Sequence, residues 1–278
     1  MDELCHEAGV DGRDARLLRQ CANAVFLLPR EAAVVRLAPV SQALLDRAQT
    51  TVRMARWLEN IGFPAVRLLA GVERPVVAGG CLATFWQFIP QPDRQPEPTL
   101  LVPLLAELHE LIPPFSVPRW SPVADARRRL SNSADLASAQ FLSQWCDRLD
   151  GQLSQVRYEL PASLIHGDAW VGNLLWSDRG VVLSDLDQVC FGPREWDLVP
   201  TVVNAMRFGE PSYESFLRAY GHDVTAWPGF PVLREARELT MLTGVLPALA
   251  SSPSISAEFE RRMADLREEA SGLWAPYK

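Results

Sequence analysis

Asp168, Asn173 and Asp185 stand close together in the chain, and all three side chains carry oxygen atoms that can bind a divalent cation. Two apolar segments follow Asp168, at Asn173–Trp176 and Val181–Leu183, and a polar Ser-Asp-Arg-Gly sequence joins them. This pattern predicts a β-hairpin. Because a hairpin returns the chain to its starting point, we expect the three side chains to face one place.

Carboxylate and amide oxygens suit Mg²⁺, which retains several waters and usually binds through one or two carboxylates together with substrate phosphates. A further carboxylate beside the cation can orient a hydroxyl group and accept its proton. Phosphoryl transfer needs little else, since it depends on positioning and on neutralising the charge of the phosphate oxygens. The cluster therefore predicts a phosphotransferase that uses Mg²⁺ and acts on a hydroxyl group.

The chain before this cluster predicts strands around one helix. Ser41 is a suitable N-cap for a helix over Gln42–Asn60, in which apolar residues recur at helical spacing. Apolar segments separated by turn residues predict five strands, at Ala22–Leu28, Ala32–Ala38, Ala65–Leu69, Arg74–Ala78 and Cys81–Ile89.

Four prolines between Pro90 and Pro98 predict a connector, because proline resists both helix and central strand. A strand-rich insert is expected over Ser163–Leu186. Helices are expected at Thr99–Leu111, Val123–Leu130, Asp135–Val156, Glu195–Phe208, Tyr213–Tyr220, Pro231–Leu249 and Ala257–Leu273. The order predicts an α+β protein with an N-terminal lobe over residues 1–89 and a C-terminal lobe over residues 90–278.

Three short motifs resemble those of the aminoglycoside phosphotransferase family, which also includes choline and homoserine kinases. They are His166-Gly167-Asp168 with Asn173 five residues after the aspartate, Asp185-Leu186-Asp187, and Gly192-Pro193-Arg194-Glu195-Trp196-Asp197. The resemblance implies a bilobal protein-kinase-like fold. It further implies a small nucleotide-binding lobe of five antiparallel strands and one helix, and a larger, mainly helical lobe with the catalytic loop and the acceptor site.

The same resemblance implies a role for each motif residue. Asp168 is expected to be the catalytic base, and Asn173 and Asp185 are expected to bind Mg²⁺ at the nucleotide phosphates. Asp187 either holds a second metal indirectly or forms a hydrogen bond to the loop. His166 and Asp197 are expected to brace the catalytic loop rather than to react.

The N-terminal lobe departs from the family pattern in three ways. Arg36 stands where kinases carry a lysine for the nucleotide phosphates, and no acidic residue of the following helix falls in register with it. Cys21-Ala22-Asn23 replaces a glycine-rich loop. The backbone groups of Gln87 and Ile89 are expected to contact the purine, which leaves the choice between ATP and GTP open.

The net charge of −7 argues against non-specific binding to nucleic acid. The first ten residues lack the pattern of a signal peptide, the most apolar stretch is interrupted by charged residues, and five scattered cysteines form no disulfide framework. We therefore expect a cytoplasmic protein that does not enter the membrane. The oligomeric state stays open.

The expected partner is a small molecule that accepts phosphate on a hydroxyl group. Four acidic residues near the motif favour a cationic aminoglycoside or another antibiotic, and hence a role in antibiotic resistance; they are Asp168, Asp187, Glu195 and Asp197. Two alternatives remain: a kinase for Ser or Thr of a peptide in a biosynthetic pathway, and a nucleotide-binding scaffold without catalysis. The intact motif residues argue against the scaffold.

Overall fold

The computed structural model describes residues 1–20, 23–131, 138–209, 213–250, 252–268 and 272–277. The chain forms two compact units. The amino-terminal unit comprises Met1–Leu100, Pro113–Val117 and Val171–Val189, and the carboxyl-terminal unit comprises Leu101–Ile112, Pro118–Trp170 and Cys190–Lys278. The division expected after residue 89 stays a prediction. Cys21, Ala22 and residues 135–137, at which a strand and a helix were expected to begin, lie outside the described residues.

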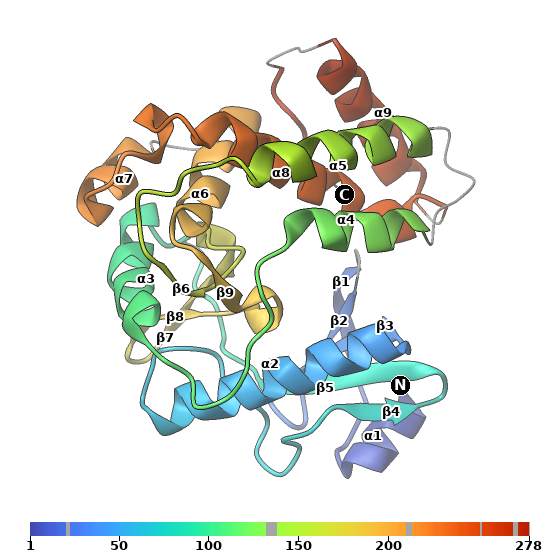
Figure 1. Cartoon of the computed structure of the whole chain (residues 1–278). Coiled ribbons are helices and arrows are strands. Elements are labelled where there is room, and N and C mark those ends of the chain that lie inside the picture. The colour runs from blue at the N-terminus through green and yellow to red at the C-terminus, as the bar shows by residue number, and fades with distance from the viewer. Residues whose placement is uncertain (21–22, 132–137, 210–212, 251, 269–271, 278) are drawn as a thin grey trace. The chain divides into compact units, whose positions relative to one another are not determined.

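A five-stranded antiparallel sheet forms the frame of the amino-terminal unit (Figure 1). Its strand order is β1-β2-β3-β5-β4, with β1 at Arg16–Gln20, β2 at Ala24–Leu28, β3 at Ala33–Pro39, β4 at Val76–Ala78 and β5 at Cys81–Gln87. The expected number and direction of strands are confirmed, but β1 was not predicted. Ala65–Leu69 is not a strand: Ala65 bridges Leu183 and Leu68 bridges Trp86, so no single partner continues a ladder.

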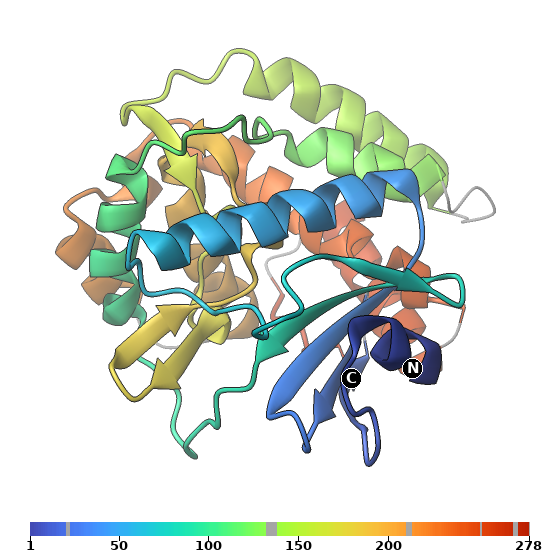
Figure 2. The ribbon, with the colours of Figure 1, turned by 90° about the horizontal axis from the view of Figure 1, so that it is seen from below.

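Helix α2 spans Gln42–Asn60, as predicted. Its N-cap is Ser41, whose hydroxyl accepts a hydrogen bond from the backbone N–H of Leu44 over 3.3 Å. A second helix, α1 at Asp2–Ala8, corrects the expectation of one helix in this unit. It lies beside β4 (Figure 2) and adds Leu4 and Cys5 to the core under the sheet. Seven residues were too few to produce a helical pattern in the sequence.

The predicted hairpin of the motif region belongs to the amino-terminal unit. It consists of β7 at Leu174–Ser177 and β8 at Gly180–Leu183. The backbone of Leu183 donates to Pro64 over 2.9 Å and accepts from Val66 over 2.8 Å. These two bonds attach the hairpin to the segment that follows α2.

The carboxyl-terminal unit is mainly helical, as expected (Figure 1). Helix α8 contacts α4, α5 and α6, and a two-stranded antiparallel pair of β6 at Ala162–Ile165 and β9 at Cys190–Pro193 precedes α6. The helices are α3 at Leu101–Glu110, α4 at Pro122–Ser131, α5 at Ala139–Leu153, α6 at Glu195–Phe208, α7 at Glu214–Tyr220, α8 at Phe230–Thr243 and α9 at Pro253–Arg267. The helix predicted to run to Leu249 ends at Thr243, because Gly244 and Pro247 interrupt it.

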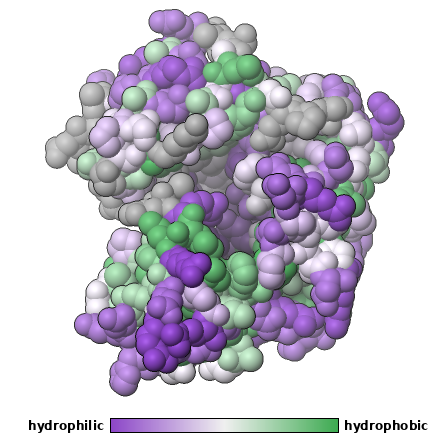
Figure 3. Space-filling view, turned by 180° about the vertical axis from the view of Figure 1, so that it is seen from behind, coloured by the Kyte–Doolittle hydropathy of each residue, from purple (hydrophilic) through white to green (hydrophobic). Residues whose placement is uncertain are grey.

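Hydrophilic side chains predominate on the face shown in Figure 3, and hydrophobic side chains form smaller patches among them. Among the described residues, no helix combines the length and the apolar character that crossing a membrane requires.

Candidate active site

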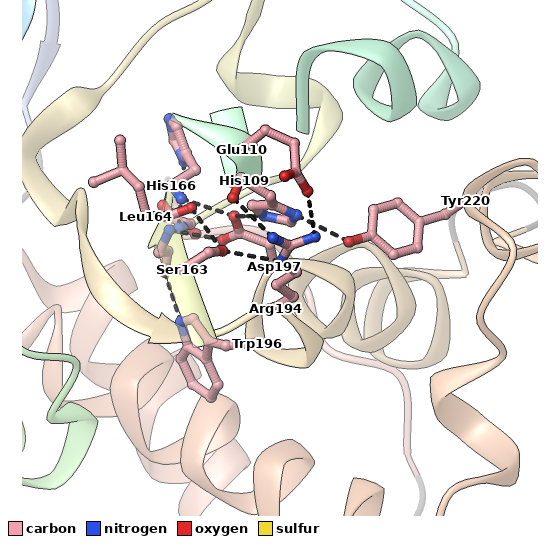
Figure 4. Close-up of polar contacts among 11 residues, drawn as sticks. His109, Glu110, Ser163, Leu164, His166, Arg194, Trp196, Asp197 and Tyr220 are labelled. Carbon is pink, nitrogen blue, oxygen red and sulfur yellow. Dashed lines mark hydrogen bonds and ion pairs between the residues drawn. The ribbon is translucent and has the colours of Figure 1, made fainter. Parts of the chain in front are cut away.

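The loop that follows β6 is held by Asp197, from the first turn of α6 (Figure 4). The Asp197 carboxylate accepts hydrogen bonds from the backbone N–H groups of His166 and Gly167, each over 2.7 Å. It also lies 3.0 Å from Nε2 of His109, and the side chains of Asp197 and His109 are both fully buried. The expectation that Asp197 braces the catalytic loop is confirmed.

Further bonds hold the same loop at its carbonyl groups. The indole N–H of Trp196 donates to the carbonyl of Gly167 over 2.8 Å, and the Thr201 hydroxyl donates to that of Ala169 over 3.3 Å. The ring of the buried His166 accepts from the backbone N–H of Asp168 over 3.3 Å, as expected of a bracing residue. Gly167 adopts a positive φ of 82°, which favours glycine at this position of the loop.

The residues of the motif that precede Asp197 attach this part of the chain to its neighbours. Glu195 is fully buried and accepts from the backbone N–H groups of Glu159 and Leu160 over 2.7 and 2.8 Å. A Cβ atom on Gly192 would lie 2.5 Å from the side chain of Trp120, so that only glycine fits there. These residues attach β9 and α6 to their neighbours. Both bonds use Oε1 of Glu195, and its buried Oε2 has no hydrogen-bond partner among the described residues.

Arg194 of the same motif connects three parts of the unit (Figure 4). Its guanidinium donates to the Ser163 hydroxyl over 3.2 Å, to the His109 carbonyl over 2.9 Å and to the Glu110 carboxylate over 2.8 Å. The contact between His109 and Asp197 could not be predicted, because no local pattern around His109 points to it.

Asp168, the expected catalytic base, is one quarter exposed and forms an ion pair with Arg237. Nη2 of Arg237 lies 2.7 Å from Oδ1 of Asp168. Arg237 lies on α8, next to Glu238, which accepts from Arg207 over 2.7 Å in an almost completely buried ion pair. That buried pair holds α8 against α6 and thereby places Arg237. Sequence reasoning missed Arg237, which lies in no motif.

Asn173 and Asp185 come together in the amino-terminal unit. The backbone carbonyl of Asn173 accepts from the backbone N–H of Ser184 over 2.8 Å and from its hydroxyl over 3.1 Å. Asp185 follows with a φ of 57°, in the left-handed region that non-glycine residues rarely adopt outside functional sites. Asp168 belongs to the other unit, so the expected convergence of all three residues stays a prediction.

Arg36 of β3 lies between the two carboxylates that follow β8. Its Nη1 donates to Oδ1 of Asp185 over 2.9 Å, and its Nη2 lies 2.9 Å from Oδ2 of Asp187. Burial alone would lower the pKa of Arg36, but Asp187 and Asp185 outweigh that effect and raise the pKa above its ordinary value. Arg36 therefore remains charged, and its partners are these carboxylates rather than an acidic residue of α2.

Asp187 links this ion pair to α2. Burial raises the pKa of its carboxyl, and the positive charges of Arg36 and Arg47 and a hydrogen bond from the Thr51 side chain oppose that shift. Arg47 and Thr51 both lie on α2. These contacts go to α2 and not to the loop, so both roles expected of Asp187, indirect metal binding and a hydrogen bond to the loop, stay predictions.

The donors at the two ends of the hairpin, Asn173 before β7 and Asp185 after β8, fit a magnesium ion in their chemistry. Among the described residues, no group of three or more His, Cys, Asp or Glu side chains is placed to hold a metal by itself. Asn173 and Asp185 nevertheless offer an amide and a carboxylate oxygen, and Mg²⁺ commonly takes one or two carboxylates and completes its shell with phosphates and water. In this structure Oδ1 of Asp185 accepts a hydrogen bond from Arg36.

The segment expected to meet the purine is partly engaged within the unit. The backbone N–H of Gln87 donates to the carbonyl of Arg67 over 2.9 Å, and the carbonyl of Ile89 accepts from the side chain of Gln91 over 2.9 Å. The other backbone groups of these two residues are the ones a nucleotide can use. Their contact with a purine stays a prediction.

A sequence model described as the phosphotransferase enzyme family matches residues 16–238. An amicoumacin kinase solved with AMP-PNP, Ca²⁺ and Ami is 16% identical with a TM-score of 0.67, over 95% of this chain and 91% of that one. An aminoglycoside phosphotransferase of Streptomyces rimosus is also 16% identical, with a TM-score of 0.63. The match covers 85% of this chain and 96% of that one. A choline kinase of Streptococcus pneumoniae is 13% identical, with a TM-score of 0.61. The match covers 92% of this chain and 93% of that one.

These likenesses confirm the expected kinase-like fold. No curated protein has a matching sequence.

Proposed function

Because the chain belongs to the phosphotransferase enzyme family, we propose that it transfers the γ-phosphate of ATP to a hydroxyl group of a small molecule. Asp168 is the catalytic base of this proposal, and Asn173 and Asp185 are the ligands of Mg²⁺. The observation that carries it is the clamp of Asp197 on the backbone of His166 and Gly167, which determines the position of the neighbouring Asp168.

Each step of the reaction falls to a named group. The acceptor hydroxyl donates a hydrogen bond to the carboxylate of Asp168, which orients its oxygen and takes its proton as the new P–O bond forms. When bound, Mg²⁺ would neutralise the charge of the nucleotide phosphates. Asp197 holds its carboxylate against two N–H groups throughout and exchanges no proton with the substrate.

Arg36 has two tasks in the proposal. Without nucleotide it neutralises Asp185 and Asp187, and with nucleotide it turns toward the phosphates, for which its planar fork suits bidentate contact. Gln87 and Ile89 contact the purine through their backbone groups, with ATP or GTP as the nucleotide. A nucleoside triphosphate as phosphate donor favours the cytoplasm as the place of action.

The structure changes what we propose about the charge of the acceptor. A cationic aminoglycoside was expected because four acidic residues lie near the motif, and the structure engages each of them with a group of the protein. We propose an antibiotic or another small hydroxyl compound as acceptor, with antibiotic resistance as a role, and without a requirement for positive charge.

Calorimetric titration of ATP and GTP, with and without Mg²⁺, tests the nucleotide part of the proposal. We expect binding that depends on Mg²⁺ and that Asp185→Asn abolishes. Asp178→Asn, in the exposed turn of the same hairpin, is the matched control and should bind as the wild type does. Binding that survives Asp185→Asn unchanged would exclude Asp185 as a metal ligand.

Screening hydroxyl compounds for the gain of a phosphate group by mass spectrometry tests the transfer. Asp168→Asn should lower kcat by roughly 10²–10⁴-fold, the range for loss of a general base, while Mg²⁺-dependent nucleotide binding remains. Normal turnover in this variant would refute the role of Asp168.

A further inference from the structure

Four carboxylates made a cationic acceptor attractive, and the structure gives each of them a partner within the protein. Asp187 pairs with Arg36, and Glu195 and Asp197 accept from backbone N–H groups inside the fold. Asp168 pairs with Arg237. Because each carboxylate already has a partner, the residue that pairs with Asp168 becomes the guide to the acceptor.

Arg237 is the charged side chain that pairs with Asp168. It is 12% exposed, and its Nη2 lies 2.7 Å from Oδ1 of the carboxylate. Its Nε is buried and has no hydrogen-bond acceptor in the described part of the chain. A buried N–H group without an acceptor is unfavourable, so the guanidinium gains if a bound molecule supplies oxygen atoms.

The acidic residues of α8 that flank Arg237 are engaged elsewhere. Glu238 accepts from Arg207 over 2.7 Å and from Arg234 over 3.0 Å. Glu235 accepts from the indole of Trp145 over 3.1 Å and from Arg148 over 2.8 Å. Within the described part of the chain, Asp168 is therefore the carboxylate that forms an ion pair with Arg237.

We propose that Arg237 binds a carboxylate group of the acceptor, and that the enzyme phosphorylates a hydroxy acid. The group that now faces the guanidinium is a carboxylate, so an acceptor carboxylate is its direct chemical replacement, and the planar fork of arginine matches such a group in two places. The inference rests on the proposed function, because it takes Asp168 to be the base of that same site.

The exchange of partners also prepares Asp168 for its reaction. Arg237 faces Oδ1 of the Asp168 carboxylate in this structure. An acceptor whose carboxylate binds the guanidinium brings its hydroxyl group to the Asp168 carboxylate. The hydroxyl oxygen then forms the bond to the γ-phosphorus, the bond from that phosphorus to the ADP oxygen breaks, and the hydroxyl proton passes to Asp168.

Two sets of matched polyols test the proposal, each with one acidic, one neutral and one basic member. They are gluconate, sorbitol and glucamine, and glycerate, glycerol and 3-amino-1,2-propanediol. Binding to the full chain is measured by calorimetry with and without Mg²⁺ and ADP, and kcat and KM are measured with Mg²⁺ and ATP. We expect the acid of at least one set to bind about tenfold or more tightly than its neutral and basic partners.

Two arginine variants of α8 test whether Arg237 causes the preference for the acidic polyol. Arg237→Gln should weaken binding of the acid by about tenfold to a hundredfold, through KM, and should remove the preference for the acid over the neutral polyol. Arg234→Gln, which removes the more exposed partner of Glu238, should keep the preference. Three outcomes would overturn the proposal. The preference for the acid could survive Arg237→Gln, the members of both sets could bind equally or not at all, or the amine could bind most tightly.

Nucleotide titrations on the same samples separate this inference from the proposed function. Mg²⁺-dependent ATP binding without preference for an acid contradicts the assignment of Arg237 alone. Loss of ATP affinity in Arg237→Gln, with no acceptor present, would also overturn it, because the arginine would then serve the phosphates. A wild type that binds no nucleotide contradicts the proposed function.

Discussion

Nη1 of Arg36 lies 2.9 Å from Oδ1 of Asp185, so the arginine expected at the nucleotide phosphates holds the carboxylate expected at the magnesium ion. Under the proposed function, nucleotide and metal therefore compete with an internal ion pair for these two side chains.

Arg36→Gln should remove this internal cation and leave Asp185 and Asp187 with less positive charge beside them. We expect the free energy of unfolding to fall by about 1–3 kcal/mol, less than for a fully buried pair because these side chains are partly exposed. Mg²⁺ alone should bind more tightly than in the wild type, since it no longer competes with the guanidinium. Urea denaturation and calorimetry measure both effects, with Arg56→Gln as the control for an exposed ion pair. Unchanged affinity for Mg²⁺ would contradict the competition.

Asp197→Asn should loosen the catalytic loop. An amide oxygen cannot replace both carboxylate oxygens at the N–H groups of His166 and Gly167, so we expect a loss of stability of about 2–4 kcal/mol. Displacement of Asp168 should lower kcat by about a hundredfold and leave the KM for ATP nearly unchanged. Hydrogen exchange at Gly167 and Asp168 should become faster. A variant that is as protected and as active as the wild type would show that the clamp does not position the loop.

Gly192→Ala should destabilise the carboxyl-terminal unit, because the added methyl group would lie 2.5 Å from Cβ of Trp120 and 2.8 Å from Cδ1 of Ile165. We expect a cost of about 1–3 kcal/mol in urea denaturation. Gly151→Ala in α5 is the opposite control: nothing lies within 4 Å of its added Cβ, so it should stabilise the helix by about 0.5–1 kcal/mol. The same sign for both variants would mean that this close approach does not constrain β9.

Protonation of Glu258 on α9 should weaken its hydrogen bond with the backbone N–H of Ala275 in acid. Burial would raise the pKa of Glu258, but hydrogen bonds from Arg261, Arg262 and the backbone N–H of Ala275 lower it below the ordinary value of 4.5. A lowered pKa in the folded state means that this stabilisation is complete above pH 4.5 and is lost as the pH falls through the folded-state pKa.

Denaturation from neutral pH to about pH 3 measures that loss. Glu258→Gln should be less stable than the wild type at neutral pH, and the difference should shrink in acid. Glu260→Gln, exposed on the same helix, should follow the wild type throughout. A difference that stays constant with pH would mean that ionisation of Glu258 does not hold Ala275.

Local patterns accounted for most elements. The bounds of α2 and α6 agree with the prediction, since the Ser41 cap and the helical spacing of apolar residues depend only on near neighbours. Arg16–Gln20 carries no alternation that would indicate a strand, and it forms one only through pairing with β2. Ala65–Leu69 has the composition of a strand, yet its two bridges go to different partners.

The catalytic motif could be read from the chain alone, because the spacing of Asp168, Asn173 and Asp185 and the hairpin between them are local features. Membership of the phosphotransferase family agrees with that interpretation. The partners of the charged groups became visible only in the folded units: Arg36 at Asp185, Arg237 at Asp168 and His109 at Asp197. Each pair joins residues far apart in the chain. Ion pairs and hydrogen bonds act over a few ångströms in space, and the fold alone determines which distant residues come that close.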